Sequence, residues 1–413
     1  MSTRRLDTGE LELGGGLEVL VAAALEGMAA GERLEVLTPS RSTALELPGW
    51  ARIAGHEVVG ERTPAGGPYA VQIARGPFAR FLAEPLPERG SGLPLRSGEL
   101  HTADLRPAAD VPPAVEAAAG FAPLGAIAER GSPPFRWGLN ERDAIWADDV
   151  GDLAEQASAA QWDASRDIPW EAACGLPDFM ERAVSQVMTF IAQNEYAALY
   201  VPARFLVDIN PRYPEMLMWL ASHVHDEARH VEVFTKRSLI GGQPSYALAS
   251  TELSLRTLLD EHDFSGAALL LNVLGEGTFL DLLRFVERHA PDAATRSAAT
   301  LAHRDERRHV HFGISHIRRR LAADPDEKAA LVGAAERRAA KLTEMSGLSP
   351  LLTEGLTVMA AGSLQPAELG EGAVAVRELI QTMEGNRIRR LRAAGFDRRT
   401  AKHLSDLHTP NLM

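Results

Sequence analysis

The sequence predicts a mainly α-helical protein: a four-helix bundle with a small α/β domain before it and further helices after it. Four long stretches carry apolar residues at helical spacing, at 176–209, 212–239, 265–289 and 292–322. Breaks separate them at Asn210-Pro211, Gly241-Gly242-Gln243-Pro244 and Ala290-Pro291, where proline and glycine are expected to end helices. Short patterns of alternating strand and helix are confined to the first 83 residues.

The N-terminal 83 residues are expected to form the α/β domain. The pattern predicts a strand and turn, a helix, a strand, a second helix and two further strands, at 11–16, 17–31, 32–40, 43–56, 57–62 and 68–75. Residues 84–165 are rich in proline and glycine and are interpreted as a connecting region. The bundle is assigned to 166–325 and a helical extension to 326–413, with helices at 326–345, 350–361, 366–395 and 397–406.

Composition limits the partners. The 413 residues carry a formal net charge of −13, which argues against a nucleic-acid partner because phosphate binding needs a basic surface. Cys174 is the single cysteine, so an internal disulfide or a thiolate metal cluster cannot form. The N-terminus lacks the apolar core of a signal peptide, and apolar runs such as 267–274 are too short to span a membrane. We therefore expect a cytoplasmic protein whose metals are bound through oxygen and nitrogen.

A repeated motif marks the candidate site. The sequences DEARH at 226–230 and DERRH at 305–309 both contain Glu-x-x-His, and both are followed by valine. On a helix, residues three apart share a face, so Glu227 with His230, and Glu306 with His309, can grip one ion. One such motif occurs often by chance as a surface polar pair. Two copies in the same residue order are specific, and bundle sites of this type need one more glutamate from each of two other helices.

Glu195 and Glu276 are the candidates for these two ligands. Each is a lone acid in a nearly apolar run, where a carboxylate is costly to bury unless it is paired or bound to metal. The alternative is that each lies on a narrow polar edge of its helix. Helix lengths favour the metal: about 14 residues lead from Glu195 to the turn and about 14 return to Glu227, so both carboxylates reach the same height. The hairpin from Glu276 to Glu306 closes in the same way.

The ligand set predicts the ions. Four carboxylates and two neutral imidazoles balance two divalent cations, and this donor set suits iron, with manganese as the alternative. Asp226 and Asp305 are expected to hold the ligand histidines crosswise, Asp226 with His309 and Asp305 with His230, with Arg229 and Arg308 neutralising the aspartates or forming surface ion pairs. His223, one turn before Glu227, is either a seventh ligand or a hydrogen-bonded core histidine, and the second interpretation is preferred.

With these residues in place, 170–322 resembles the ferritin-like di-iron carboxylate proteins. The Asp-Glu-x-Arg-His motif is similar to that of the bacterial multicomponent monooxygenases. Asn194-Glu195-Tyr196 and Ile168-Pro169-Trp170 look more like the benzoyl-CoA and phenylacetyl-CoA epoxidases and the arylamine N-oxygenases. The resemblance implies a di-iron centre with O₂ as co-substrate and catalytic roles for the four glutamates, Glu195, Glu227, Glu276 and Glu306.

The N-terminal domain resembles the TusA/SirA sulfur carriers through 31–37 and 50–59. That family has a Cys-Pro pair where the first strand meets the first helix, but Gly15, Gly16 and Leu17 stand here. Persulfide carriage is therefore excluded for this segment, and a docking or structural role is expected.

Together these observations predict an O₂-dependent di-iron oxygenase that hydroxylates, epoxidises or N-oxygenates a small organic substrate, aromatic or thioester-linked among the options. An external electron donor, a reductase or ferredoxin, is implied. The alternative is a ferritin-like protein that oxidises or binds iron without an organic substrate, although a storage ferritin is a short single bundle without such flanking segments. The C-terminal helices either cover the site or form a homodimer contact.

Overall fold

The computed structural model describes residues 3–62, 67–78, 100–105, 111–115, 120–124, 126, 133, 135–242, 245–342 and 350–408. The chain divides into two compact units, one of residues 1–93 and 118–135 and one of residues 94–117 and 136–413. The mainly α fold with a small α/β region is confirmed.

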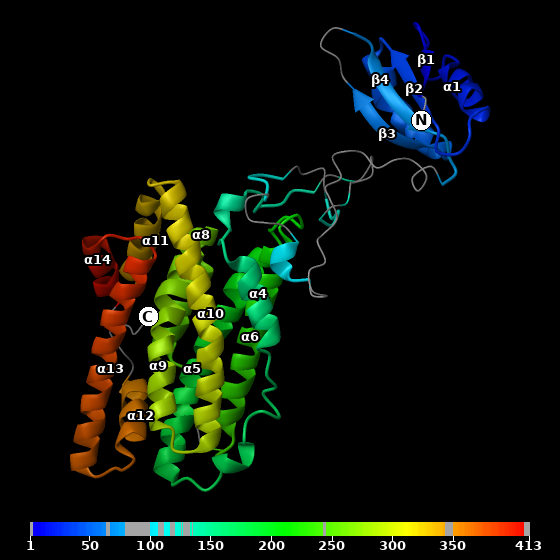
Figure 1. Ribbon diagram of the computed structural model, residues 1–413. Helices are drawn as coiled ribbons and strands as arrows, with labels where there is room; N and C mark the ends of the chain where they lie inside the picture. The colour runs from blue at the N-terminus through cyan, green and yellow to red at the C-terminus, as the bar shows by residue number, and fades with distance from the viewer. Residues whose placement is uncertain are drawn as a thin grey trace. The chain divides into compact units, whose positions relative to one another are not determined.

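The smaller unit is a four-stranded sheet with two helices (Figure 1). Its elements are β1 (Arg4–Asp7), α1 (Leu17–Glu26), β2 (Arg33–Thr38), α2 (Arg41–Ile53), β3 (Glu57–Arg62) and β4 (Tyr69–Ala74). The strand order is β1-β2-β4-β3, with β1 parallel to β2 and the other pairs antiparallel. The apolar faces of α1 and α2 bury Leu17, Val21 and Leu47 against the sheet.

The strand predicted at 11–16 was wrong. The first strand lies earlier, at Arg4–Asp7, at the edge of the sheet. Three of its four residues are exposed, so its sequence lacks the alternation of apolar and polar residues by which a strand is recognised. Residues 13–16 form a turn, and Gly14 and Gly16 take φ values of 80° and 106°, which favour glycine. The glycines that suggested the end of a strand therefore form the turn that precedes α1.

The larger unit is a bundle of long antiparallel helices (Figure 1). Its first hairpin is α5 (Asp178–Leu206) and α6 (Pro214–Leu239), and its second is α9 (Gly277–His289) and α10 (Ala293–Ala323). A crossover carrying α7 (Ala249–Leu259) joins the hairpins, as in bundles with one long connection. Further helices are α4 (Val150–Ala159), α8 (Phe264–Ala268), α11 (Glu327–Leu342), α12 (Pro350–Ala361), α13 (Pro366–Ala393) and α14 (Arg398–His408).

The third long helix departs from the prediction of one regular helix at 265–289. Between α8 and α9 the chain forms a π-helical stretch, η6 (Leu269–Glu276), which ends on a predicted ligand. Its wider turns change the direction in which side chains leave the helix, and such stretches are frequent at functional sites. The helix Phe264–His289 is long and apolar enough to cross a membrane, but 89% of its most apolar window is buried inside the protein, the position of a core helix.

Two hydrophobic cores lie one at each end of the bundle. One includes buried apolar residues between 197 and 220, from α5, α6 and the turn that joins them, between 269 and 274 of η6, and between 312 and 317 of α10. The other includes buried apolar residues between 180 and 192 of α5, at 233–234 of α6, between 279 and 286 of α9, and between 294 and 302 of α10. Between them every long helix carries polar residues, at Glu195, 223–230, Glu276 and 305–309. The candidate site is therefore a polar layer enclosed by apolar packing on both sides, which excludes water from it.

Candidate metal centre

The structure brings the six predicted ligands into one buried layer. Glu227 and His230 come from α6, Glu306 and His309 from α10, Glu195 from α5 and Glu276 from the end of η6, and none is more than 4% exposed. They form two groups of potential ligands. His223, Glu227, Glu276 and His309 make the first group, and Glu195, Glu227, His230 and Glu306 make the second; within each group the ligand atoms lie within 4.8 Å of one another.

The two motif glutamates lie between the two motif histidines. Glu227 places Oε1 2.8 Å from Nδ1 of His309 and Oε2 3.3 Å from Nδ1 of His230. Glu306 does the same in reverse, with Oε1 3.4 Å from Nδ1 of His230 and Oε2 3.4 Å from Nδ1 of His309. Each carboxylate thus offers one oxygen to each histidine. Metal ions held here would be bound by Glu227, Glu306 and the two histidines, with Glu276 in the first group and Glu195 in the second.

The donor atoms fit metal ions better than they fit one another. Both oxygens of Glu227, both of Glu306, Oε1 of Glu195 and Nδ1 of both motif histidines are buried, and they make no well-aimed hydrogen bond with any residue that the structure describes. Within each group these donor atoms lie within 4.8 Å of one another, although none of them donates or accepts a hydrogen bond with the described residues. Buried polar atoms are normally satisfied, so a whole set left without partners needs an explanation. Two cations held among these atoms would satisfy them.

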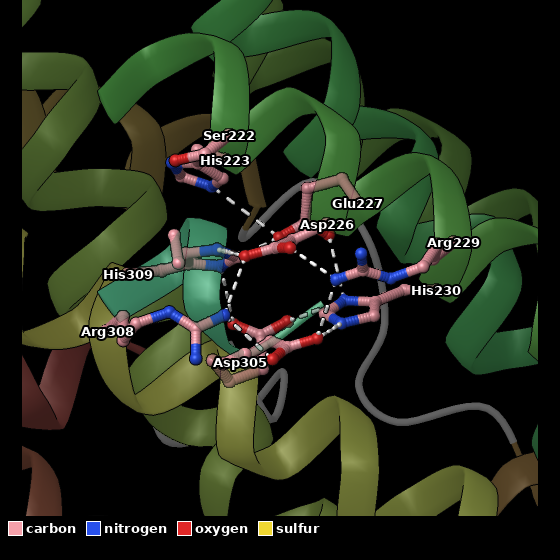
Figure 2. A network of polar contacts seen from close by, with 12 residues as sticks. Ser222, His223, Asp226, Glu227, Arg229, His230, Asp305, Arg308 and His309 are labelled. Carbon is pink, nitrogen blue, oxygen red and sulfur yellow. Dashed lines mark hydrogen bonds and ion pairs between the residues drawn. The ribbon is translucent and has the colours of Figure 1, made fainter. Parts of the chain in front are cut away.

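His223 lies inside the first group. Its Nε2 is 3.1 Å from Oε1 of Glu276 and 3.5 Å from Oε1 of Glu227, and its ring stacks on that of His309 with centroids 3.8 Å apart. Figure 2 shows the ring directed into the cluster. The side chain is therefore a hydrogen-bond partner of Glu276, and it is also placed where a seventh ligand would stand.

Burial and neighbouring charges shift the pKa values of the buried glutamates, and the shifts differ in direction. Burial, followed by the charges of Glu227 and Glu306, raises the pKa of Glu195 well above its usual value. Burial also raises the pKa of Glu276, against the opposing charge of His223. Burial opposes ionisation of Glu227 as well, but the neighbouring His230 and the other histidines hold its pKa well below normal.

The motif histidines respond to the same charges. Burial lowers the pKa of His230 and His309, but the carboxylates around them outweigh it, and both pKa values end well above normal. Protons on these rings thus balance the buried carboxylates. Divalent ions compete with those protons for the same nitrogen atoms, so metal binding is coupled to proton release.

A second layer of ionic residues surrounds the ligands (Figure 2). Nε2 of His309 lies 3.4 Å from Oδ2 of Asp226, and Nε2 of His230 lies 3.4 Å from Oδ2 of Asp305, the crosswise arrangement expected from the repeat. These contacts direct Nδ1 of each ring toward the cluster. The aspartates are bridged in turn by two arginines: Arg308 donates to both, at 2.9 and 2.7 Å, and Arg229 also contacts both. All four charges are buried, so the arginines form no surface ion pair.

Residues before the bundle complete this layer, and sequence reasoning missed them. The indole Nε1 of Trp162 donates to Oδ2 of Asp305 at 2.6 Å, and its ring stacks on His230 and under the guanidinium of Arg229. Gln161 contacts both Asp226 and Arg229. No spacing in the sequence links residue 162 with residue 305, so only the fold could have revealed this contact.

Two apolar slots reach the ligands. The first is lined by residues that include His223, Phe264, Phe312 and Leu271. The second is lined by Glu195, Glu276 and Glu306 together with apolar side chains and Arg338. Each has a cavity volume of about 20 Å³, so both slots are narrow, with room for about one water molecule.

Comparison with known proteins gives a limited result. No protein-family model matches the chain, and no curated protein matches it. Among solved structures, an R2-like ligand-binding oxidase mutant with an aerobically reconstituted Fe/Fe cofactor is 17% identical, with a TM-score of 0.45, covering 60% of this chain and 93% of its own. A mutant of the same kind of oxidase with an anaerobically reconstituted Mn/Fe cofactor is 16% identical, with a TM-score of 0.44, covering 58% and 92%. At these values the likeness is no evidence about the reaction.

Proposed function

We propose that this protein is an O₂-dependent di-iron oxygenase that hydroxylates, epoxidises or N-oxygenates a small organic substrate. The observation that carries the proposal is the pair of glutamates, Glu227 and Glu306, each with one oxygen beside each of two buried histidines. Oxygen and imidazole donors without thiolate suit iron, with manganese as the alternative. A pair of such ions supplies, when bound, the redox chemistry with O₂ that side chains alone cannot perform.

The chain's own residues supply the remaining functions. Glu195 and Glu276 complete the two ion positions, and Asp226 and Asp305 hold the histidine rings with Nδ1 facing inward. The hydrophobic cores on both sides keep water out, which protects reactive species from side reactions. The apolar lining of the slots favours the approach of O₂ and an apolar substrate, and electrons come from an external reductase or ferredoxin.

Iron oxidation without an organic substrate is the competing function. The mainly apolar lining of the second slot, beside Glu195 and Glu276, favours an organic molecule over hydrated iron as the species that approaches the centre. O₂ consumption by the reduced, iron-loaded protein, measured with candidate substrates, distinguishes the two functions. Oxygenated product supports the oxygenase, whereas accumulation of ferric mineral without product supports iron oxidation.

The ligand assignment is tested separately by metal analysis. Glu227→Ala or His309→Ala should abolish the binding of two irons per chain, because each removes donors from the shared centre. Glu232→Ala is the matched control, since that glutamate lies on the same helix with its side chain 47% exposed. If either ligand variant still loads two irons per chain, the assignment is wrong.

We also propose that the N-terminal unit is a TusA-like domain that serves docking or structure. The order of its strands and helices supports this, and Gly15, Gly16 and Leu17 precede or begin α1 where the carriers have Cys-Pro. Peptide mapping after treatment with a sulfane-sulfur donor should find no sulfur added to this unit. Sulfur on any of its peptides would contradict the proposal.

A further inference from the structure

The outer surface of α9 and α10 carries a cluster of exposed arginines that the metal centre does not require. The two helices lie side by side (Figure 1), and side chains of one reach the other: Nε of Arg284 donates to Nε2 of His303 at 3.1 Å. We call the cluster the arginine face; it consists of Arg284 and Arg288 of α9 and Arg296 and Arg307 of α10. At 1.5 Å per residue it extends about 16 Å along α10.

The arginines of this face keep their positive charge. Arg288 and Arg307 make no hydrogen bond or ion pair with any residue that the structure describes. Arg296 donates to the backbone carbonyls of residues 287 and 290, at 3.4 Å each, and carbonyls carry no net charge. The face therefore presents guanidinium groups to solvent without acids bound to them.

The acids beside the arginine face do not cancel its charge. Asp281 is already paired with Arg390 at 2.8 Å. Glu287 accepts a hydrogen bond from the neutral hydroxyl of Thr300 at 3.0 Å and stays available to the arginines. Four arginines against this one carboxylate leave three positive charges, on a chain whose formal net charge is −13. The face is therefore a local exception that attracts negative charge.

The face lacks the apolar side chains of a permanent interface. Neither α9 nor α10 exposes a large apolar residue, and both helices are described along their whole length. Obligate dimer interfaces are hydrophobic, and membrane-surface helices insert apolar side chains between lipids. Electron-transfer encounters between proteins are instead small and transient, so a charged surface without apolar residues suits them.

The arginine face also lies at the level of the metal centre. Glu306 directly precedes Arg307 on α10, and its side chain is buried among the predicted ligands. The helix therefore presents one side to the centre and the other to solvent. A helix with its side chains is about 10 Å across, so a protein bound to this face would be about one helix diameter from the centre. Electron transfer slows steeply with distance, so this position favours a redox partner.

We propose that the arginine face is the docking surface of an acidic one-electron carrier protein that supplies the electrons of the reaction. The inference rests on the proposed function. Transfer of one oxygen atom of O₂ to a substrate reduces the other atom to water and consumes two electrons and two protons. Each carrier gives up one electron and leaves oxidised, so two encounters supply one turnover. Complementary charges speed the encounter and set its orientation.

The test measures reduction without turnover. Iron-loaded, oxidised protein is mixed in the absence of O₂ with a reduced plant-type [2Fe–2S] ferredoxin, which is an acidic carrier, and oxidation of the ferredoxin is followed by its absorbance. At an ionic strength of about 0.01 M, the double variant Arg288→Glu/Arg307→Glu should slow the second-order reaction about 10- to 100-fold, because electrostatic steering is reversed. At about 1 M the difference should disappear, because salt screens exposed charges.

A matched control makes the same change of charge elsewhere on α10. Arg318 is exposed and lies about 16 Å beyond Arg307 along the helix, so Arg318→Glu should leave the rate nearly unchanged. Reduced methyl viologen is a small donor that needs no docking, and it should reduce all variants at the same rate. Metal analysis should find the same iron content in each, because neither substituted arginine is a ligand.

A milder variant covers the case in which the double reversal fails to fold. Arg288→Gln/Arg307→Gln removes both charges without reversing them and should slow reduction by ferredoxin about 5-fold at low salt. An unchanged rate in the folded variants would overturn the proposal. If they instead lose binding to phosphatidylglycerol vesicles, or convert a dimer into a monomer, while ferredoxin still reduces them at the original rate, the face serves a membrane or a second copy and not a carrier.

The outcome is separable from that of the proposed function. If the double variant loses reduction by ferredoxin but the unaltered protein oxygenates no substrate offered with O₂, the docking surface stands and the oxygenase fails. If the unaltered protein forms oxygenated product with ferredoxin as donor and the double variant forms it equally fast at low salt, the oxygenase stands and the docking surface fails.

Discussion

Replacing Glu195 by glutamine should make the metal-free protein more stable while it impairs the metal centre. Glu195 is 2% exposed, and other carboxylates of its group offer oxygens within 4.8 Å. Two like charges at that separation repel by about 3 kcal/mol at an effective dielectric constant near 20. The amide has the same shape and no charge, so Glu195→Gln removes this repulsion together with the penalty of burying the charge.

Protonation limits the gain and gives it a pH dependence. Glu195 has a folded-state pKa raised well above its usual value, so as pH rises the folded metal-free protein keeps this proton after the unfolded chain has lost it. The acid therefore destabilises the folded state above the pKa of the unfolded chain, and this penalty disappears as pH falls toward that value. The stabilisation by Glu195→Gln should therefore be largest at pH 7 and should decrease as the pH is lowered.

The assay is urea denaturation of chelator-treated protein at pH 7 and pH 5, with metal analysis of iron-loaded samples. Glu195→Gln should gain stability at pH 7, gain much less at pH 5, and bind one iron less tightly than the unaltered protein. Glu232→Gln, at an exposed position of α6, should show none of these effects. Equal or lower stability of metal-free Glu195→Gln at pH 7 would refute the electrostatic reasoning.

Three further outcomes are expected. Trp162→Phe removes the 2.6 Å hydrogen bond to Asp305 and should lower metal affinity about 10- to 100-fold, measured by competition with a chelator; an unchanged affinity would show that the indole only packs. His223→Ala should weaken the binding of the metal ion beside Glu276 by a similar factor and leave the binding of the other ion unchanged in a stepwise titration. Equal weakening of both ions would contradict a specific role for His223 at the first group. Burial lowers the pKa of His316 to about 4. As pH falls from 6.5 to 4, the unfolded chain therefore binds a proton at this residue before the folded protein does, and the free energy of unfolding should drop by up to about 3 kcal/mol. His316→Gln should flatten this pH dependence in denaturation curves, and an unaltered slope would contradict the assignment.

The sequence identified the ligand candidates because their chemistry conflicts with their surroundings. Glu195 and Glu276 are acids within apolar runs, and burial of a lone carboxylate needs a compensating partner. The repeated motif placed Glu227 and Glu306 on the ligand face, since residues three apart share one side of a helix. The structure gathers these four glutamates in one layer.

Other features depend on contacts that no local pattern encodes. The stretch Leu269–Glu276 has the composition of an ordinary α-helix, and its π-helical form becomes visible only in three dimensions. Helix α7 was not predicted, yet it provides Leu255 and Leu258 to the lining of the second slot. Arg338 lies 29 residues after His309, the last predicted ligand, in a segment with ordinary surface composition, so nothing in the sequence distinguishes it from the exposed Arg337 beside it.

The internal repeat makes two equivalent half-sites, and single residues then make them unequal. The offset that relates Asp226 to Asp305 relates His223 to Ala302, so only α6 offers an additional nitrogen to the cluster. Trp162 stacks on His230, whereas the ring that stacks on His309 is that of His223. Two metal ions held here would therefore have Glu227 in common but differ in the residues around them. Because the surroundings of the two groups differ, the proposed oxygenase would offer a small molecule two unequal positions, and this difference would favour one orientation of the substrate over the other.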